Sequence, residues 1–171
     1  GASNVAVGTQ SLASNTTASN NTAVGYQAAY STTTSNRLTV LGQQAGYGQQ
    51  TGSENTYVGY QSGPNTVANA SGSSNTSLGA FSLYSNTTAS NNTAVGYQAG
   101  YTNTTGAENT ATGYRALASN TTASNNTAFG RTALEDNTTG ANNTAVGFKT
   151  LQLNTTGTQN TAVGANALDS N

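Results

Sequence analysis

The chain has 171 residues, a length that suits one domain, but only 5% of them are charged, against roughly 25% in an ordinary globular domain. It carries four basic and five acidic side chains, a net charge of −1, and no His, Cys, Met or Trp. This composition argues against metal sites built on His or Cys, nucleophile–histidine catalysis, disulfide frameworks and the cationic surface that nucleic-acid binding needs. No apolar run approaches the ~20 residues of a membrane span. We therefore expect a protein that is not an enzyme and has no cofactor.

A glycine recurs at a fixed spacing along the whole chain, as the fifth residue of the motif N-T-A-V-G and its variants. The spacing is 17 residues throughout, except for one interval of 20. Ten repeats thus form a single array over residues 1–171, with a three-residue insertion within residues 60–78. The array starts and stops in the middle of a repeat, so we expect it to be part of a longer fibre. The glycines are Gly8, Gly25, Gly42, Gly59, Gly79, Gly96, Gly113, Gly130, Gly147 and Gly164.

Each repeat combines a short strand-like segment with a stretch rich in Asn, Thr, Ser and Gly. These residues are weak helix formers and favour turns, so a helical repeat fits poorly. About eight turn residues per repeat are too many for a plain hairpin and suit the corner of a coil. The predicted fold is all-β: a β-solenoid or β-roll with one coil per repeat, about 48 Å long at a strand spacing of ~4.8 Å.

Aligning the repeats places residues of one kind in columns, numbered here by their position in the 17-residue unit. The fifth-column glycine is expected to adopt a positive φ or to allow close backbone approach. First-column asparagines are expected to form an amide ladder along the axis: Asn4, Asn21, Asn55, Asn75, Asn92, Asn109, Asn126, Asn143 and Asn160. The fourth column is expected to fill the interior as an apolar ladder: Val7, Val24, Leu41, Val58, Leu78, Val95, Phe129, Val146 and Val163.

Alanine dominates the third and eighth columns, which indicates a face packed so tightly that only a methyl group fits. Each coil has one or two large apolar side chains, so a single chain would have a small core. Packing three copies around a common axis would bury the alanine-rich face. We therefore expect a homotrimer, intertwined or side by side.

Tandem N-T-A-V-G-Y-Q-A units separated by N-T-T-G resemble the repeats of bacteriophage tail fibres, from Asn4 to Asn171. They are similar also to the head repeats of trimeric autotransporter adhesins, although a period of 17 is longer than is usual there. The resemblance implies a homotrimeric fibre segment on a virion or bacterial surface that mediates attachment. The phage-type fibre is favoured, and the alternative is a head or stalk repeat of a bacterial surface adhesin. The implied partner is a host-surface glycan or protein receptor.

Other features suggest sites of lesser weight. Sixth-column aromatics are possible glycan contacts, although such rings also pack between coils or chains: Tyr26, Tyr60, Tyr97 and Tyr114. The insertion, which breaks the pattern between residues 63 and 72 and holds the only proline, is either a binding loop or a neutral bulge. Threonine pairs such as Thr16–Thr17 leave an ice-binding solenoid as a less favoured alternative. The acidic pair Glu135–Asp136 is expected to be a solvated corner rather than a catalytic pair.

Overall fold

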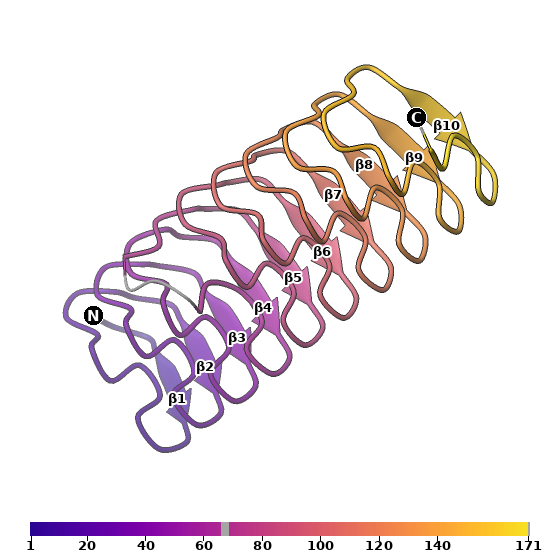
Figure 1. The fold of residues 1–171 in the computed structure, drawn as a ribbon. Helices are drawn as coiled ribbons and strands as arrows, with labels where there is room; N and C mark the ends of the chain where they lie inside the picture. Colours follow the sequence, from indigo (N-terminus) through magenta and orange to yellow (C-terminus); the bar gives the residue numbers. More distant parts are fainter. Residues whose placement is uncertain (66–68, 171) are drawn as a thin grey trace.

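The computed structural model describes residues 1–65 and 69–170, and these form a single β-solenoid (Figure 1). Each repeat contributes one three-residue strand and returns through turns, and no helix that could cross a membrane occurs among these residues. The ten strands form one parallel sheet in sequence order. They are β1 (Val5–Val7), β2 (Thr22–Val24), β3 (Thr39–Leu41), β4 (Thr56–Val58), β5 (Thr76–Leu78), β6 (Thr93–Val95), β7 (Thr110–Thr112), β8 (Thr127–Phe129), β9 (Thr144–Val146) and β10 (Thr161–Val163).

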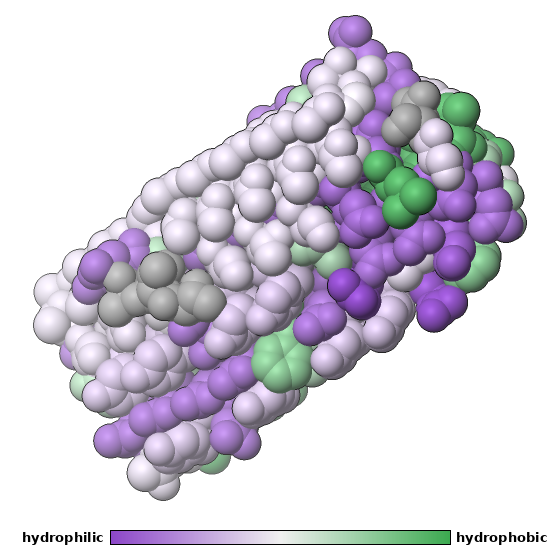
Figure 2. Space-filling view, viewed as in Figure 1, coloured by the Kyte–Doolittle hydropathy of each residue, from purple (hydrophilic) through white to green (hydrophobic). Residues whose placement is uncertain are grey.

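The pairing confirms the predicted all-β solenoid and its repeat length. Ala23 of β2 pairs with Val40 of β3, and Ala111 of β7 pairs with Ala128 of β8, so the same column meets in neighbouring coils. The register continues across the longer interval, where Tyr57 of β4 pairs with Ser77 of β5. Because every strand is parallel and in register, each column becomes a straight row along the axis. Rows of similarly coloured side chains are visible on the face in Figure 2.

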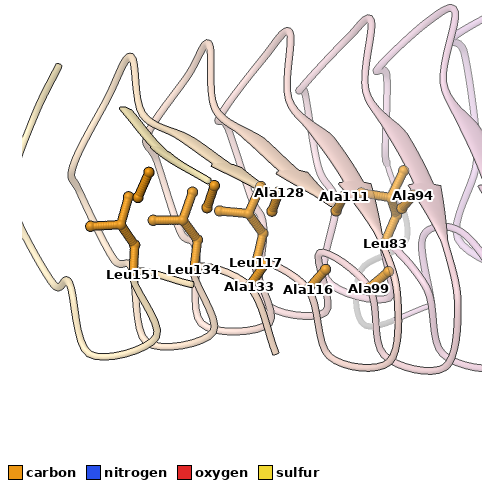
Figure 3. Close-up of a cluster of buried hydrophobic side chains, with 12 residues drawn as sticks. Leu83, Ala94, Ala99, Ala111, Ala116, Leu117, Ala128, Ala133, Leu134 and Leu151 are labelled. Atoms are coloured by element: carbon orange, nitrogen blue, oxygen red, sulfur yellow. The ribbon is translucent and has the colours of Figure 1, made fainter. Parts of the chain in front are cut away.

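The interior is lined by the third, eighth and ninth columns. Third-column Ala94, Ala111 and Ala128 face ninth-column leucines such as Leu117 and Leu134, and all five are at most 2% exposed (Figure 3). One leucine per coil is therefore the main apolar side chain of the core in this half of the rod. Where Gly100 replaces that leucine, a void of about 10 Å³ lies between Leu83 and Leu117.

The prediction that the fourth column fills the interior is wrong. Side chains alternate along a strand, so the middle residue of each three-residue strand points inward and the outer two point outward. Leu41, Phe129 and Val163 are 48%, 57% and 70% exposed. Val7 and Leu78 are also exposed, and the other apolar members of the column are half-buried: Val24, Val58, Val95 and Val146.

The expectation that alanine-rich columns form a contact between chains is also corrected. Ala23, Ala28, Ala94 and Ala99 are fully buried inside one chain. Small side chains suit these positions because the third and eighth columns approach each other across the interior, where the hydroxyls of Ser62 and Ser77 lie 2.8 Å apart. The small core that suggested a homotrimer is thus closed by the coil itself.

The first-column asparagines form a ladder of a different kind from the one predicted. The Oδ1 of Asn92 accepts the backbone N–H of Asn109 at 2.9 Å, and the Nδ2 of Asn92 donates to the carbonyl of Gly106 at 3.0 Å. Asn126 likewise accepts the backbone N–H of Asn143. These side chains satisfy backbone groups of the next coil. Among the asparagines, amide-to-amide bonding occurs mainly in the twelfth column, where Asn120, Asn137 and Asn154 each donate to the preceding amide at 2.8–3.0 Å.

Both structural reasons for glycine apply in the fifth column. Gly96 has a φ of 133°, and a Cβ built on it would lie 2.5 Å from the carbonyl oxygen of Gly113 in the next coil. Gly96 directly follows β6, and the chain bends there as it enters the corner.

Candidate functional site

The outer face of the sheet is the most distinctive surface of the molecule. Fourth-column Leu41, Leu78 and Phe129 project from it and are about half exposed. Second-column threonines lie beside them in β2 to β10, six exposed and three half-buried: Thr22, Thr39, Thr56, Thr76, Thr93, Thr110, Thr127, Thr144 and Thr161. The face therefore carries one apolar row and one threonine row along the whole rod. Contiguous exposed apolar side chains of this kind mark contact surfaces on soluble proteins.

The predicted aromatic contacts lie on the corner that follows the sheet. Tyr26, Tyr60, Tyr97 and Tyr114 are 43–46% exposed. The rings of Tyr97 and Tyr114 stack with centroids 5.6 Å apart and an interplanar angle of 12°. Phe81 of the seventh column lies edge-on against both Tyr60 and Tyr97 and so bridges the coil whose sixth-column residue is Ala80.

Tenth-column tyrosines form a second set of stacks. Tyr30 stacks on Tyr47 at 5.0 Å, and Tyr84 stacks on Tyr101 at 5.2 Å. Parallel rings at this separation cover one another's faces and present mainly edges and hydroxyls outward. A sugar that stacks on a tyrosine needs an exposed face. These rows therefore suit edge contacts and hydrogen bonds better than ring stacking.

Two cations lie against the sixth-column row, Arg131 within it and Lys149 from the seventh column. The guanidinium of Arg131 lies between Tyr114 and Phe148, with its Cζ 5.6 Å and 5.4 Å from their ring centroids. The Nζ of Lys149 lies 5.6 Å from the centroid of Phe148. Arg115 instead pairs with Glu135 at 2.9 Å. Tyr114, Arg131 and Phe148 share the sixth column, whereas Lys149 belongs to the seventh, so the column alone does not indicate its contact with Phe148.

The expectation that the acidic pair Glu135–Asp136 is a solvated corner fails for Glu135. Glu135 is only 7% exposed, and its carboxylate contacts Arg115 and accepts a hydrogen bond from Gln152 at 2.7 Å. Asp136 is half-buried. The carboxylate of Glu135 therefore has a structural role. Across residues 1–65 and 69–170, no group of three or more His, Cys, Asp or Glu side chains is placed to hold a metal.

The flanks of the insertion remain hydrogen-bonded to the coils. The backbone N–H of Asn65 donates to Tyr84 at 3.0 Å, and Gln49 forms an isolated parallel bridge with Ala70. In the repeat that holds the insertion, Tyr57 occupies the third column in place of alanine and is fully buried. The expected binding loop includes residues 66–68, which lie outside the described residues.

The fold and these rows define the chain as a β-solenoid repeat protein with an apolar outer face and an aromatic corner. Comparisons with protein-family models, with curated proteins and with solved structures gave no match. Its function is therefore inferred from its geometry and from the resemblance of its repeats.

Proposed function

We propose that this chain is a non-enzymatic structural and adhesive segment of an extracellular fibre, of the phage tail-fibre type, that attaches a virion to a host cell surface. The observation that carries the proposal is the apolar row on the outer face of the sheet. It has an apolar side chain in nine of the ten coils, with Thr112 the exception, so another copy running in the same direction can match it coil by coil. The sequence motifs of the repeats support the phage-type fibre, and a bacterial surface adhesin is the alternative with the same geometry.

We further propose that three copies pack side by side through this outer face, with their axes parallel. In this arrangement the copies meet through the fourth column, and not through the alanine-rich columns that the sequence had suggested. Like charges do not oppose it, because the row contains Val, Leu, Phe and Thr alone. Burying an exposed Leu or Phe stabilises an assembly by roughly 1–2 kcal/mol. The row has Leu or Phe in three coils and the smaller Val in six.

Sedimentation equilibrium of the purified chain tests this arrangement. The wild type should have three times the mass of one chain, and the variant Leu41→Asp/Phe129→Asp should dissociate at least about 100-fold more readily because carboxylates would be buried. Both positions are exposed in one chain, so the variant should fold, which circular dichroism checks. The control Thr34→Asp/Thr122→Asp places the same charges on an exposed row of another face and should leave the mass unchanged. A monomeric or dimeric wild type at high micromolar concentration contradicts the proposal.

The threonine row supports an ice-binding solenoid as a second candidate. Thr93, Thr127 and Thr161 lie on a sheet of parallel in-register strands, which is flatter than the turns that hold the threonine pairs. Regular hydroxyls and methyls about 4.8 Å apart are the kind of array that matches a crystal lattice. Thermal hysteresis at millimolar protein would favour this candidate, and its loss in Thr93→Lys/Thr127→Lys would assign it to the row.

A further inference from the structure

The structure assigns a second contact surface to the corner of coils six to nine, and we propose that it binds a carboxylate-bearing polysaccharide. The surface consists of Tyr97, Tyr114, Arg131, Phe148 and Lys149, and we call it the cationic stack. It deepens the proposed attachment function, on which it rests, by naming the chemical class of the receptor.

The geometry of Arg131 carries the first step of the argument. Its guanidinium lies between two aromatic rings, which hold the planar group in one orientation while the residue remains exposed. A guanidinium held in this way keeps its outer N–H groups for an incoming acceptor, and its fork matches the two oxygens of a carboxylate. A cation–π contact occupies the face of the guanidinium and leaves the edge free.

The charges around the stack carry the second step. Among the described residues, the ion pairs are Arg37–Glu54 and Arg115–Glu135, so Arg131 and Lys149 have no carboxylate partner. Glu135 is close to Arg131 in the sequence, but its carboxylate already contacts Arg115 and accepts a hydrogen bond from Gln152. Two uncompensated cations in adjacent coils therefore form a local positive site on a chain of net charge −1.

The same chain contains an uncharged counterpart of this arrangement. In coils two to four the sixth column reads Tyr26, Gln43 and Tyr60, with the neutral Gln43 at the place that Arg131 has between Tyr114 and Phe148. The seventh column there is a hydrogen-bonded glutamine row, with Gln44 donating to Gln27 at 2.9 Å. The coils therefore stack at these positions without a cation, so the stacking of the coils does not by itself require a positive charge at Arg131.

The length and polarity of the stack favour a sugar polymer over other anions. Four coils span about 15 Å, which is longer than a single carboxylate or phosphate ion needs. Single-stranded nucleic acid binds aromatic sites by stacking bases on open ring faces. Here the faces of Tyr114 and Phe148 are covered by neighbouring rings and cations. Ring edges and tyrosine hydroxyls remain, and these suit the hydroxyl-rich rim of a saccharide.

The position of the stack is compatible with the proposed oligomer. The fourth column lies on the sheet, whereas the sixth and seventh columns follow the bend at the fifth-column glycine and lie on the corner. Three parallel copies joined through the sheet would carry three stacks around one axis. Repeated weak contacts of this kind give avidity for a polymer that bears one anion per ring.

Calorimetric titration of the whole chain with oligogalacturonate tests the inference, with dextran as the neutral probe. Wild type should bind oligogalacturonate and not dextran. Arg131→Gln should weaken binding about tenfold or more, since charge-assisted hydrogen bonds are lost, and Arg131→Lys should restore only part of it. The matched control Arg37→Gln removes a cation from another column and should leave affinity unchanged. Equal losses in Arg131→Gln and Arg37→Gln would indicate general electrostatic attraction and overturn the proposal.

Further outcomes separate this inference from the fibre itself. A trimeric wild type that ignores oligogalacturonate, or that binds dextran or oligo(dT) as tightly, overturns the cationic stack and leaves the fibre standing. A monomer that binds oligogalacturonate through Arg131 contradicts the trimer and keeps the stack. If Arg131→Gln lowers the mass in sedimentation equilibrium, the cation serves contacts between copies and the polysaccharide assignment is wrong.

Discussion

Gly96 and Gly100 occupy the same coil, but they carry glycine for different reasons. Gly96 combines a φ of 133° with direct approach to the backbone of the next coil. Gly100 has a φ of 59°, and a Cβ there would come no nearer than 3.0 Å to the end of the Leu83 side chain. Ala29 and Leu83 adopt the same left-handed conformation in the ninth column, with φ of 52° and 48°. The solenoid therefore tolerates side chains in that column and excludes them from the fifth.

This contrast predicts losses of different size for the same substitution at the two sites. Gly96→Ala should lower the free energy of unfolding by about 2–4 kcal/mol, because the methyl meets backbone atoms that cannot move independently. Gly100→Ala should lower it by at most about 1 kcal/mol, since the left-handed strain is partly offset by filling the void. Urea denaturation of both variants measures the difference. Similar losses in the two would show that positive φ, not the approach of the coils, requires glycine.

Tyr57 shows how one large residue is accommodated in a narrow interior. Glycines at 46 and 63 lie against its ring, where a Cβ would clash, and its hydroxyl donates to Gln49 Oε1 at 2.9 Å. Gln49 in turn replaces the twelfth-column asparagine and donates to the carbonyl of Gly52. Burial raises the pKa of the Tyr57 hydroxyl well above its ordinary value near 10.

The raised pKa of Tyr57 predicts a loss of stability in alkali. The unfolded chain releases this proton near pH 10 while the folded chain retains it, so the contribution is complete below about pH 10 and declines above it. Melting temperatures measured from pH 8 to 11 should fall more steeply for wild type than for Tyr57→Phe. Tyr26→Phe, which alters an exposed ring, should follow the wild type. Parallel profiles for wild type and Tyr57→Phe would falsify this assignment.

At the scale of the element, the stacking unit is a coil whose polar interior groups are satisfied by the next coil. Asn120 donates to Asn103 Oδ1 at 2.8 Å and to the carbonyl of Ala123, and its own oxygen accepts from Asn137. The twelfth-column row is fully buried over Asn103, Asn120 and Asn137. Each amide is therefore a link between neighbouring coils, and it fixes their register.

Replacing one link should cost more than its own hydrogen bonds suggest. Asn120→Leu leaves an oxygen on Asn103 and an N–H on Asn137 buried without partners, a loss of about 3 kcal/mol or more. Chemical denaturation measures the change, and the exposed neighbour Thr122→Val should stay within about 0.5 kcal/mol of wild type. If Asn120→Leu proved neutral, the leucine would be compensating through apolar burial, and the amide row would not govern stability.

At the scale of the whole molecule, the low charge follows from the stacking of columns. Side chains of one column lie about 4.8 Å apart, so a row of like charges would repel at every coil. Where opposite charges occupy one column in adjacent coils, they pair: Arg37 donates to Glu54 of the next coil at 3.0 Å. Elsewhere neutral amides bond along the row, as Gln27 does to Gln10 at 2.7 Å. The uncompensated pair Arg131 and Lys149 departs from this pattern, which is why we assign it an external partner.

The period, the single array and the all-β solenoid were predictable from the sequence, because a glycine every 17 residues requires the same backbone conformation in every coil. It was also predictable that the asparagine columns form hydrogen bonds between neighbouring coils, since a buried amide needs a partner. The sequence could not indicate whether Ala111 or Thr112 points inward, because alternation shows two faces without telling which one is enclosed.

The tertiary structure decided which face is enclosed, and this changed the candidate site. The third column faces inward and the fourth faces outward, so Leu41 and Phe129 are exposed, while Leu117 fills the interior from a left-handed turn position. Tyr114, Arg131 and Phe148 share one row because they are 17 residues apart, and the tertiary structure added the contact of Lys149, from the neighbouring column, with Phe148. The repeat determines which residues share a row, and only the closed coil determines what lies on each side of that row, because burial depends on the space that the backbone leaves inside.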